Sequence, residues 1–235
     1  KVANCSALMI TLDLQILAQR HKDLRNGLSA PPKMTISNMV NLLTKPSWCL
    51  GMLQTKRRQF GNIVGHVEGV DDMSSLSDWT SSQFDPSLNW EDVAELRKLW
   101  DKKLIIKGIM DKEDAKAAIR IGADAIVVSN HGGRQLDGTI SSISALPPIL
   151  DAVGDKCEVW IDGGIKTGQD ILRAVALGAQ GTLIGRAFLY GLGANGKDGV
   201  TQTLEILRKE LDLTMGLCGK RNLADVDKSI LYQYQ

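Results

Sequence analysis

The strongest constraint on the fold is an alternation of short apolar runs with amphipathic segments, which begins at about residue 94. The runs "KLIIKGI", "ADAIVVSN", "EVWIDGG" and "GTLIGRA" are rich in β-branched residues, and the segments between them have helical periodicity. Strands joined by helical connections pair in parallel, so the pattern predicts a parallel sheet covered by helices. Residues typical of helix ends agree with this: Asp111 and Thr167 at N-caps, and Gly122, Gly154 and Gly178 after C-termini.

The alternation also repeats internally. The segment "DAKAAIRIGADAIVVSN" aligns without gaps on "DILRAVALGAQGTLIGR", which places Gly122 on Gly178 and Ser129 on Gly185. Repeated αβ units of this kind suit an α/β fold of the TIM (β/α)8 type, in which functional groups gather after the C-terminal ends of the strands. The polar residues at the predicted strand ends are Asp13, Lys107, the stretch 129–134, Asp162 with Gly163 and Gly164, and Gly185 with Arg186.

Charge and cysteine usage exclude several classes of function. The sequence has 28 Lys and Arg against 27 Asp and Glu, so its net charge of +1 gives no reason to expect a nucleic-acid partner. Its four cysteines form no CxxC pair, which favours a reduced, intracellular setting. Its three histidines lack the spacing of metal ligands, so no metal site is expected.

The stretch from about residue 29 to 82 fits no βα unit. It contains "MTISNMVNLLTKPSWCLGMLQ", with apolar residues at loosely helical spacing, and the basic cluster Lys56-Arg57-Arg58. One interpretation is a long barrel insertion that packs on the domain or on a neighbouring subunit. The other is a segment, at about residues 34–60, that lies at a membrane surface with its basic groups toward anionic lipid. The sequence has no run of 18 uninterrupted apolar residues, so no membrane-spanning helix is predicted from it.

The stretch "SNHGGRQLDG", residues 129–138, is the candidate for catalysis. It places His131 and Arg134 on one loop directly after a predicted strand, and its glycines let the backbone approach a ligand closely. Histidine is the usual proton acceptor near neutral pH, and the guanidinium fork suits a carboxylate. A lone histidine is more often structural, but this loop favours a catalytic base beside an anion-binding arginine.

Several motifs in order resemble one family. They are "TLD" at Thr11, "QRHKDLRNG" at Gln19, "IIKGI" at Lys107, "SNHGGRQLDG", "IDGGIKTGQD" at Asp162 and "LIGRAFLYG" at Gly185. This set is similar to the FMN-dependent L-2-hydroxy acid dehydrogenase/oxidase family. The resemblance covers residues 1–235 as the C-terminal portion of one FMN-binding TIM-barrel domain, from its fourth strand onward, with a long insertion at about 29–82. We therefore expect the natural protein to be longer than this chain.

The resemblance implies FMN as cofactor and a role for each matching residue. His131 would be the active-site base and Asp13 its carboxylate partner, while Arg134 and Arg20 would bind the substrate carboxylate. Lys107 would lie beside flavin N1 and O2, where its charge stabilises the anionic reduced ring. The remaining matches are flavin-ring contacts from Thr11 and Ser129, and a ribityl and phosphate site formed by Asp162, Gly163, Gly164, Lys166, Gly185 and Arg186, with Lys166 in place of the more usual arginine.

The implied reaction is oxidation of an L-2-hydroxy acid to its 2-oxo acid, with His131 taking either the α-proton or the hydroxyl proton. L-Lactate is favoured as substrate, with mandelate dehydrogenase and glycolate or lactate oxidase as alternatives. The segment "PPKMTISNMVNLLTKPSW" resembles the membrane-associated members, which pass electrons to the respiratory chain through quinone. This implies a cytoplasmic protein at the inner face of the cell membrane, and a homo-oligomer that is tetrameric in the family.

Three competing interpretations remain. "GLGANG", at Gly191, Gly193 and Gly196, formally matches a dinucleotide fingerprint, but no convincing strand with an acidic end follows, so we interpret it as a turn beyond the eighth strand. A truncated, non-catalytic barrel that serves as a membrane-surface or subunit-interaction module is a second possibility, although its candidate site residues are intact. A type 2 isopentenyl diphosphate isomerase is the third, and the pairing of His131 with Arg134 favours a hydroxy acid over it.

Overall fold

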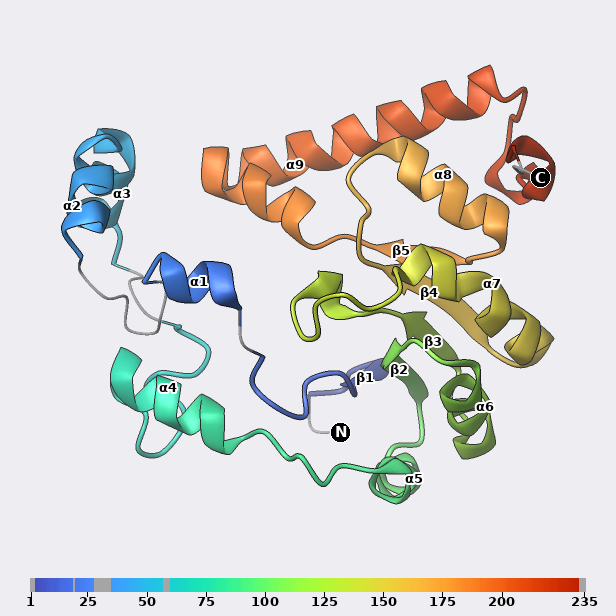
Figure 1. Cartoon of the computed structure of the whole chain (residues 1–235), viewed down its shortest axis with the longest axis horizontal. Helices are drawn as coiled ribbons and strands as arrows, with labels where there is room; N and C mark the ends of the chain where they lie inside the picture. Colours follow the sequence, from blue (N-terminus) through green and yellow to red (C-terminus); the bar gives the residue numbers. More distant parts are fainter. Residues whose placement is uncertain (1–2, 19, 28–34, 57–59, 233–235) are drawn as a thin grey trace. The chain divides into compact units, whose positions relative to one another are not determined.

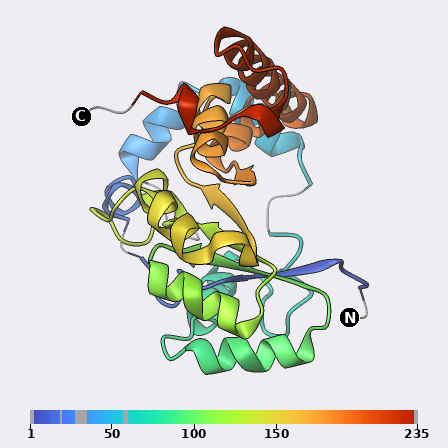
Figure 2. The ribbon, with the colours of Figure 1, turned by 90° about the vertical axis from the view of Figure 1, so that its right-hand side faces the viewer.

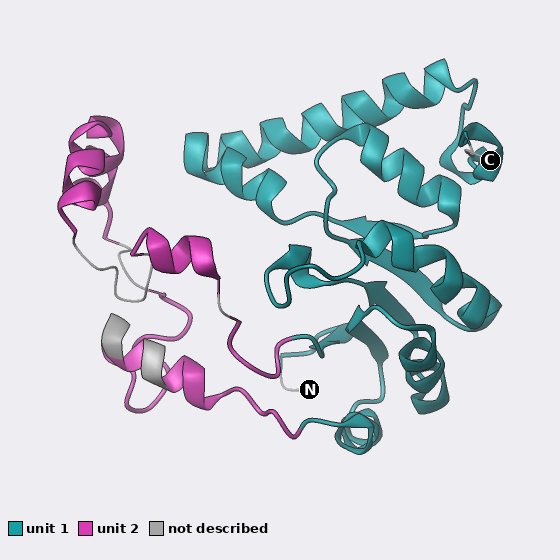
Figure 3. Cartoon of the chain, viewed as in Figure 1, with its two compact units in different colours: residues 1–13, 88–235 teal, residues 14–87 magenta. Residues whose placement is uncertain are grey.

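The computed structural model describes residues 3–18, 20–27, 35–56 and 60–232. Two compact units are present, residues 1–13 with 88–235 and residues 14–87 (Figure 3). We call them the sheet unit and the helical unit, and describe each by itself. The helical unit extends beyond both ends of the 29–82 range expected for an insertion.

The sheet unit is built on five parallel strands, and the last four of them are the runs that the alternation predicted. Their spatial order, β1-β2-β3-β4-β5, is also their order in the sequence (Figure 1). The strands are β1 (Ala7–Thr11), β2 (Lys103–Ile109), β3 (Ala125–Val128), β4 (Glu158–Asp162) and β5 (Gly181–Leu183). Consecutive parallel neighbours joined by helices are the arrangement of a TIM barrel, and the five strands correspond to those predicted from the fourth strand onward.

Helices cover one face of this sheet. They are α5 (Trp90–Leu99), α6 (Lys112–Ile121), α7 (Ser142–Val153) and α8 (Gly168–Leu177). The long α9 (Arg186–Leu217) packs against α8, and the 3-10 turns are η1 (His131–Gly133), η2 (Gly154–Lys156), η3 (Leu223–Asp225) and η4 (Lys228–Ile230). Figure 2 looks onto the covered face, where α6 and α7 lie in front of the strands. The predicted caps are confirmed: Asp111 accepts a hydrogen bond from Glu113 N, and Thr167 forms a capping box with Asp170. Gly122 and Gly178 end their helices in the left-handed region.

The strands separate two apolar layers. Leu104, Ile106, Ile126, Val128, Val159 and Ile161 face the helices, where they pack with Ala115, Ala118, Leu146 and Ile149. Ile105, Ala125 and Val127 point to the opposite face, together with Ala7, Trp160 and Leu183. We call this second face the inner face. Because successive side chains of a strand alternate between faces, both layers follow from one period-2 pattern.

The prediction that the glycines of "GLGANG" form a turn beyond the last strand is wrong. They do not form a turn after β5, because Gly191 and Gly193 lie inside α9, and only Asn195 and Gly196 depart from helical geometry. A side chain at Gly191 would collide with the Gly199 backbone. Gly191 is therefore needed for close packing of the two helical segments around the break, whereas Gly193 and Gly196 have no atom within 4 Å of an added Cβ.

The helical unit contains α1 (His21–Arg25), α2 (Ile36–Leu43), α3 (Pro46–Gln54) and α4 (Met73–Ser82), and no strand among its described residues. Neither α2 nor α3 has a buried residue. On α2 the apolar residues recur at helical spacing, and Ile36, Met39, Val40 and Leu43 are all exposed. Of the basic cluster, Arg57 and Arg58 lie outside the described residues, as do residues 29–34 of the expected insertion.

Candidate active site

Polar side chains replace apolar ones where the strands of the sheet unit end. Side chains at every second position of a strand point to the same face. Thr11 therefore points to the same face as Ala7, and Lys107 to the same face as Ile105. By the same alternation, Ser129 lies on the face of Val127, and Asp162 lies on the face of Trp160. The four polar residues therefore extend the inner face at the C-terminal edge of the sheet. In a TIM barrel this edge carries the functional site.

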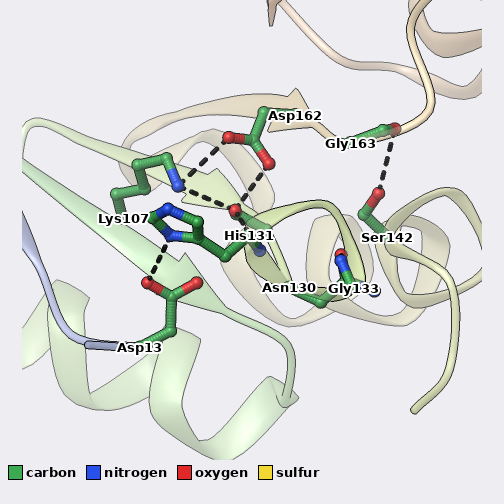
Figure 4. Close-up of polar contacts among 9 residues, drawn as sticks. Asp13, Lys107, Asn130, His131, Gly133, Ser142, Asp162 and Gly163 are labelled. Carbon is green, nitrogen blue, oxygen red and sulfur yellow. Dashed lines mark hydrogen bonds and ion pairs between the residues drawn. The ribbon is translucent and has the colours of Figure 1, made fainter. Parts of the chain in front are cut away.

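Three of these residues form one charged cluster (Figure 4). Lys107 Nζ lies 3.1 Å from Asp162 Oδ2 and donates a hydrogen bond to Ser129 Oγ over 2.9 Å. Ser129 Oγ in turn donates to Asp162 Oδ1 over 2.5 Å. Ser129 is fully buried, and the side chains of Lys107 and Asp162 are only 13% and 19% exposed. The cluster thus holds a desolvated ammonium group at a fixed place on the inner face.

His131 lies beside this cluster and contacts an acid from a distant strand end. Its Nδ1 is 3.2 Å from Asp13 Oδ1, which belongs to the segment after β1 (Figure 4). When Nδ1 donates its proton to Asp13, the other ring nitrogen, Nε2, carries the lone pair and can accept a proton. The pair has the geometry of a general base and the group that orients it.

The backbone around His131 is held in an unusual conformation. His131 has a φ of 57°, and Gly132 and Gly133 are also in the left-handed region at 66° and 70°. Asn130 stabilises the turn, because its Oδ1 accepts a hydrogen bond from Gly133 N at 3.1 Å. The His131 amide donates to Ser129 Oγ at 3.1 Å, which ties the loop to the Lys107 cluster. Strain of this kind persists only where neighbours impose it, and it is concentrated at functional sites.

Glycines and cations follow β4 and β5. Gly163 and Gly164 have φ values of 89° and 82°, and a Cβ added to Gly164 would meet nothing within 4 Å. Gly185 is the N-cap of α9, and Lys166 and Arg186 are exposed. Arg186 Nη2 donates to the Gly132 carbonyl at 3.2 Å, so this region touches the histidine loop. Glycine backbone with open space beside it, next to cations at a helix start, suits a phosphate.

Residues not singled out in the sequence shape this region. Asp170 Oδ2 accepts hydrogen bonds from Lys166 N at 3.1 Å and Thr167 N at 3.0 Å, which fixes the loop between β4 and α8. Burial raises the pKa of Asp170, but these hydrogen bonds outweigh it and hold the pKa below its usual range. Ser142 Oγ donates to the Gly163 carbonyl at 3.3 Å. The sequence "TGQD" is itself a capping-box pattern and was the available signal for Asp170.

The two arginines expected at the substrate lie in different units. Arg134 is the C-cap of η1 and is exposed, three positions beyond His131 on the same loop. Arg20 is the N-cap of α1 and belongs to the helical unit. Arg134 therefore lies on the same loop as His131, whereas Arg20 belongs to the helical unit.

A parallel βα sheet with His131, the buried Lys107 cation and glycine-containing loops gathered at its C-terminal edge has the arrangement of a TIM-barrel protein with its functional groups at that edge. The sequence matches the family model described as FMN-dependent dehydrogenase over residues 1–233. The chain belongs to this family, which confirms the TIM-barrel prediction and the resemblance.

Curated relatives include two bacterial L-lactate dehydrogenases. The protein of Haemophilus influenzae strain KW20 is 44% identical over 235 residues, covering 98% of this chain and 61% of that protein. The protein of Caulobacter vibrioides strain NA1000 is 43% identical over 231 residues, covering 97% and 60%. The chain thus spans about three fifths of the length of these relatives.

Solved structures also match. The monotopic membrane protein (S)-mandelate dehydrogenase matches with a TM-score of 0.92 and 34% identity, covering 99% of this chain and 61% of that one. Mandelate oxidase matches with a TM-score of 0.73 and 36% identity, covering 96% and 55%.

The residues present fit the FMN that the family uses. The flavin ring offers hydrogen-bond acceptors and gains negative charge on reduction, which suits Lys107 with Thr11 and Ser129 nearby on the inner face. The phosphate is a dianion, which suits the open backbone at Gly164 together with Lys166 and Arg186. Among the described residues no group of three or more His, Cys, Asp or Glu could hold a metal ion.

Proposed function

We propose that the protein oxidises an L-2-hydroxy acid to the 2-oxo acid with FMN, and that L-lactate is the substrate. The observation that carries the proposal is the contact between His131 and Asp13 beside the buried cation of Lys107. Together these residues provide a base for the substrate and a positive charge beside the electron acceptor. The identity to L-lactate dehydrogenases supports lactate.

In this proposal each residue acts on a stated atom. Arg134 pairs with the substrate carboxylate, and Arg20 assists it. His131 Nε2 takes a proton from the substrate, either from Cα or from the 2-hydroxyl, and Asp13 stabilises the resulting imidazolium. FMN, when bound, would supply the acceptor for the two electrons that leave Cα and for the second of the two hydrogens that the substrate loses. Lys107, Thr11 and Ser129 hold the ring, while Asp162, Gly163, Gly164, Lys166, Gly185 and Arg186 hold the ribityl chain and phosphate.

The electron acceptor and location form a second part of the proposal. We infer that electrons pass to a quinone of the respiratory chain, and that the protein lies at the cytoplasmic face of the cell membrane as a homo-oligomer. The exposed apolar stripe of α2 supports a membrane contact, and a similar structure is of a monotopic membrane protein. No described helix has the length and apolar character needed to cross a bilayer.

The substrate assignment predicts a spectroscopic result. Under anaerobic conditions, L-lactate is expected to bleach the visible flavin band of the purified, FMN-loaded protein, and D-lactate is expected to leave it unchanged. The absorption spectrum before and after each addition checks this. If L-mandelate or glycolate bleached the flavin band faster than L-lactate, that acid would be the substrate instead. If none of the three acids bleached the band, the proposed function would be contradicted. Reoxidation by oxygen as fast as by a soluble quinone would contradict the acceptor.

The membrane contact predicts a loss of lipid binding when the stripe of α2 is charged. Ile36→Asp with Leu43→Asp is expected to lower cosedimentation with vesicles of anionic phospholipid by at least about tenfold, since each change adds a charge to the apolar face. Ser37→Asp with Asn41→Asp, on the polar side of α2, is the matched control, because it adds the same two charges without removing apolar surface. Equal binding by the double variant and the control would contradict the proposal.

A further inference from the structure

We propose that Gly108 is a positioning residue that sets the contact between Asp13 and His131. The inference rests on the proposed function for the role of His131, but its structural basis is independent. Gly108 forms a β-bulge, because Lys107 pairs with Val127 and Ile109 pairs with the next residue, Val128. Its φ is 101°, a conformation that residues with a side chain rarely adopt.

The bulge brings the Gly108 backbone directly against Asp13. A Cβ at position 108 would lie 2.9 Å from Asp13 N and 3.0 Å from both Asp13 Cβ and Cγ. Two of these three atoms belong to the side chain that contacts His131. The chain cannot simply move away, because the preceding Leu12 N donates a 2.8 Å hydrogen bond to the Lys107 carbonyl. Any side chain at position 108 must therefore displace the Asp13 carboxyl group.

The Asp13 carboxylate has little else to hold it. Its side chain is 14% exposed, and Oδ1 makes the 3.2 Å contact with His131 Nδ1. The other oxygen, Oδ2, is buried and has no hydrogen-bond partner among the described residues. With only one polar contact, the carboxyl group owes its orientation to packing, and the bare Cα of Gly108 forms one wall of its site. This makes Asp13 sensitive to position 108.

Gly108→Ala tests the inference, with Gly122→Ala as the matched control. Gly122 has a similar φ of 84° and no atom within 4 Å of an added Cβ, so its variant carries comparable backbone strain without touching Asp13. We expect Gly108→Ala to lower kcat for L-2-hydroxy acid oxidation by about 10²-fold with little change in KM, as a misplacement of about 1 Å does. Gly122→Ala is expected to retain full activity.

A double-variant cycle separates positioning from general damage. In an Asp13→Asn background, Gly108→Ala is expected to lower kcat by less than about threefold, because it acts through a carboxylate that is already gone. An undiminished loss in that background would overturn the proposal. If Gly108→Ala alone does not fold, the double variant with Asp13→Gly removes two of the three close atoms. It is expected to fold and bind FMN, and its failure to do so would also count against the proposal.

The imidazole itself provides a readout that needs no turnover. The sequence has three histidines, so the ¹⁵N resonances of His131 can be assigned by comparison with His131→Gln. In the wild type we expect the tautomer protonated at Nδ1, and in Gly108→Ala a shift toward the other tautomer, as in Asp13→Asn. An unchanged tautomer would overturn the proposal. The expected shift in a protein that oxidises no hydroxy acid would leave this inference standing and refute the proposed function.

Discussion

Replacing His131 with glutamine is expected to lower the rate of flavin reduction by about 10²–10⁴-fold, the usual contribution of a general base. Glutamine can still donate a hydrogen bond to Asp13, but its amide cannot take up a proton from the substrate. FMN binding should be retained, because the proposed phosphate residues follow β4 and β5 and are unchanged. Anaerobic stopped-flow absorption measures the rate, and the visible spectrum of the purified variant measures bound flavin.

The conformation of His131 calls for a second variant. Its φ of 57° is costly for glutamine, whereas asparagine tolerates the left-handed region well. His131→Asn therefore removes the base without adding the same backbone strain. Both variants should lose activity to a similar extent. Recovery of flavin reduction in His131→Asn would show that loop geometry, and not proton transfer, explains the loss in His131→Gln.

Lys107→Met is expected to lower the free energy of unfolding by about 3 kcal/mol, because removal of one member of a buried ion pair leaves the other charge without compensation. The side chain of Asp162 is 19% exposed and would keep only the hydrogen bond from Ser129. Urea unfolding at constant pH measures the change. Turnover should fall as well, since the cation proposed beside the flavin is lost.

Lys103 provides the matched control on the same strand. It pairs with Asp124 at 2.7 Å, but its side chain is 72% exposed. Lys103→Met should therefore lower the free energy of unfolding much less than Lys107→Met does, because water already solvates the exposed pair. Equal losses of stability in Lys107→Met and Lys103→Met would mean that burial of the Lys107 pair has no energetic consequence. That outcome would contradict the prediction for Lys107.

The elements of the sheet unit were predictable because their signals are local. Asp111 and Thr167 cap helices through bonds to residues two or three positions away, and Gly122 ends α6 by its own conformation. Period-2 alternation likewise indicates which side of each strand faces the helices. The family resemblance supplied the link between Asp13 and His131, which no local pattern could provide.

What remained unpredicted depends on contacts between distant segments. The sequence around Gly191 predicts a turn because glycine usually ends regular structure, but its place inside α9 follows from the backbone of Gly199. The bulge at Gly108 depends on how the segment after β1 lies against β2. Such positions could be found from sequence only by knowing which segments meet.

The inner-face alternation also determines where the chain tolerates a change in length. Adding or deleting one residue within a strand would turn its polar end toward the helices and an apolar side chain toward the site. The loops and helices that connect the strands can change in length without reversing the faces of a strand. Between β1 and α5 the chain accommodates the whole helical unit, residues 14–87, and Thr11 still pairs with Lys107 in register. Variation in length, and with it the acquisition of new surfaces, is therefore confined to the loops, while the strands must remain constant in length.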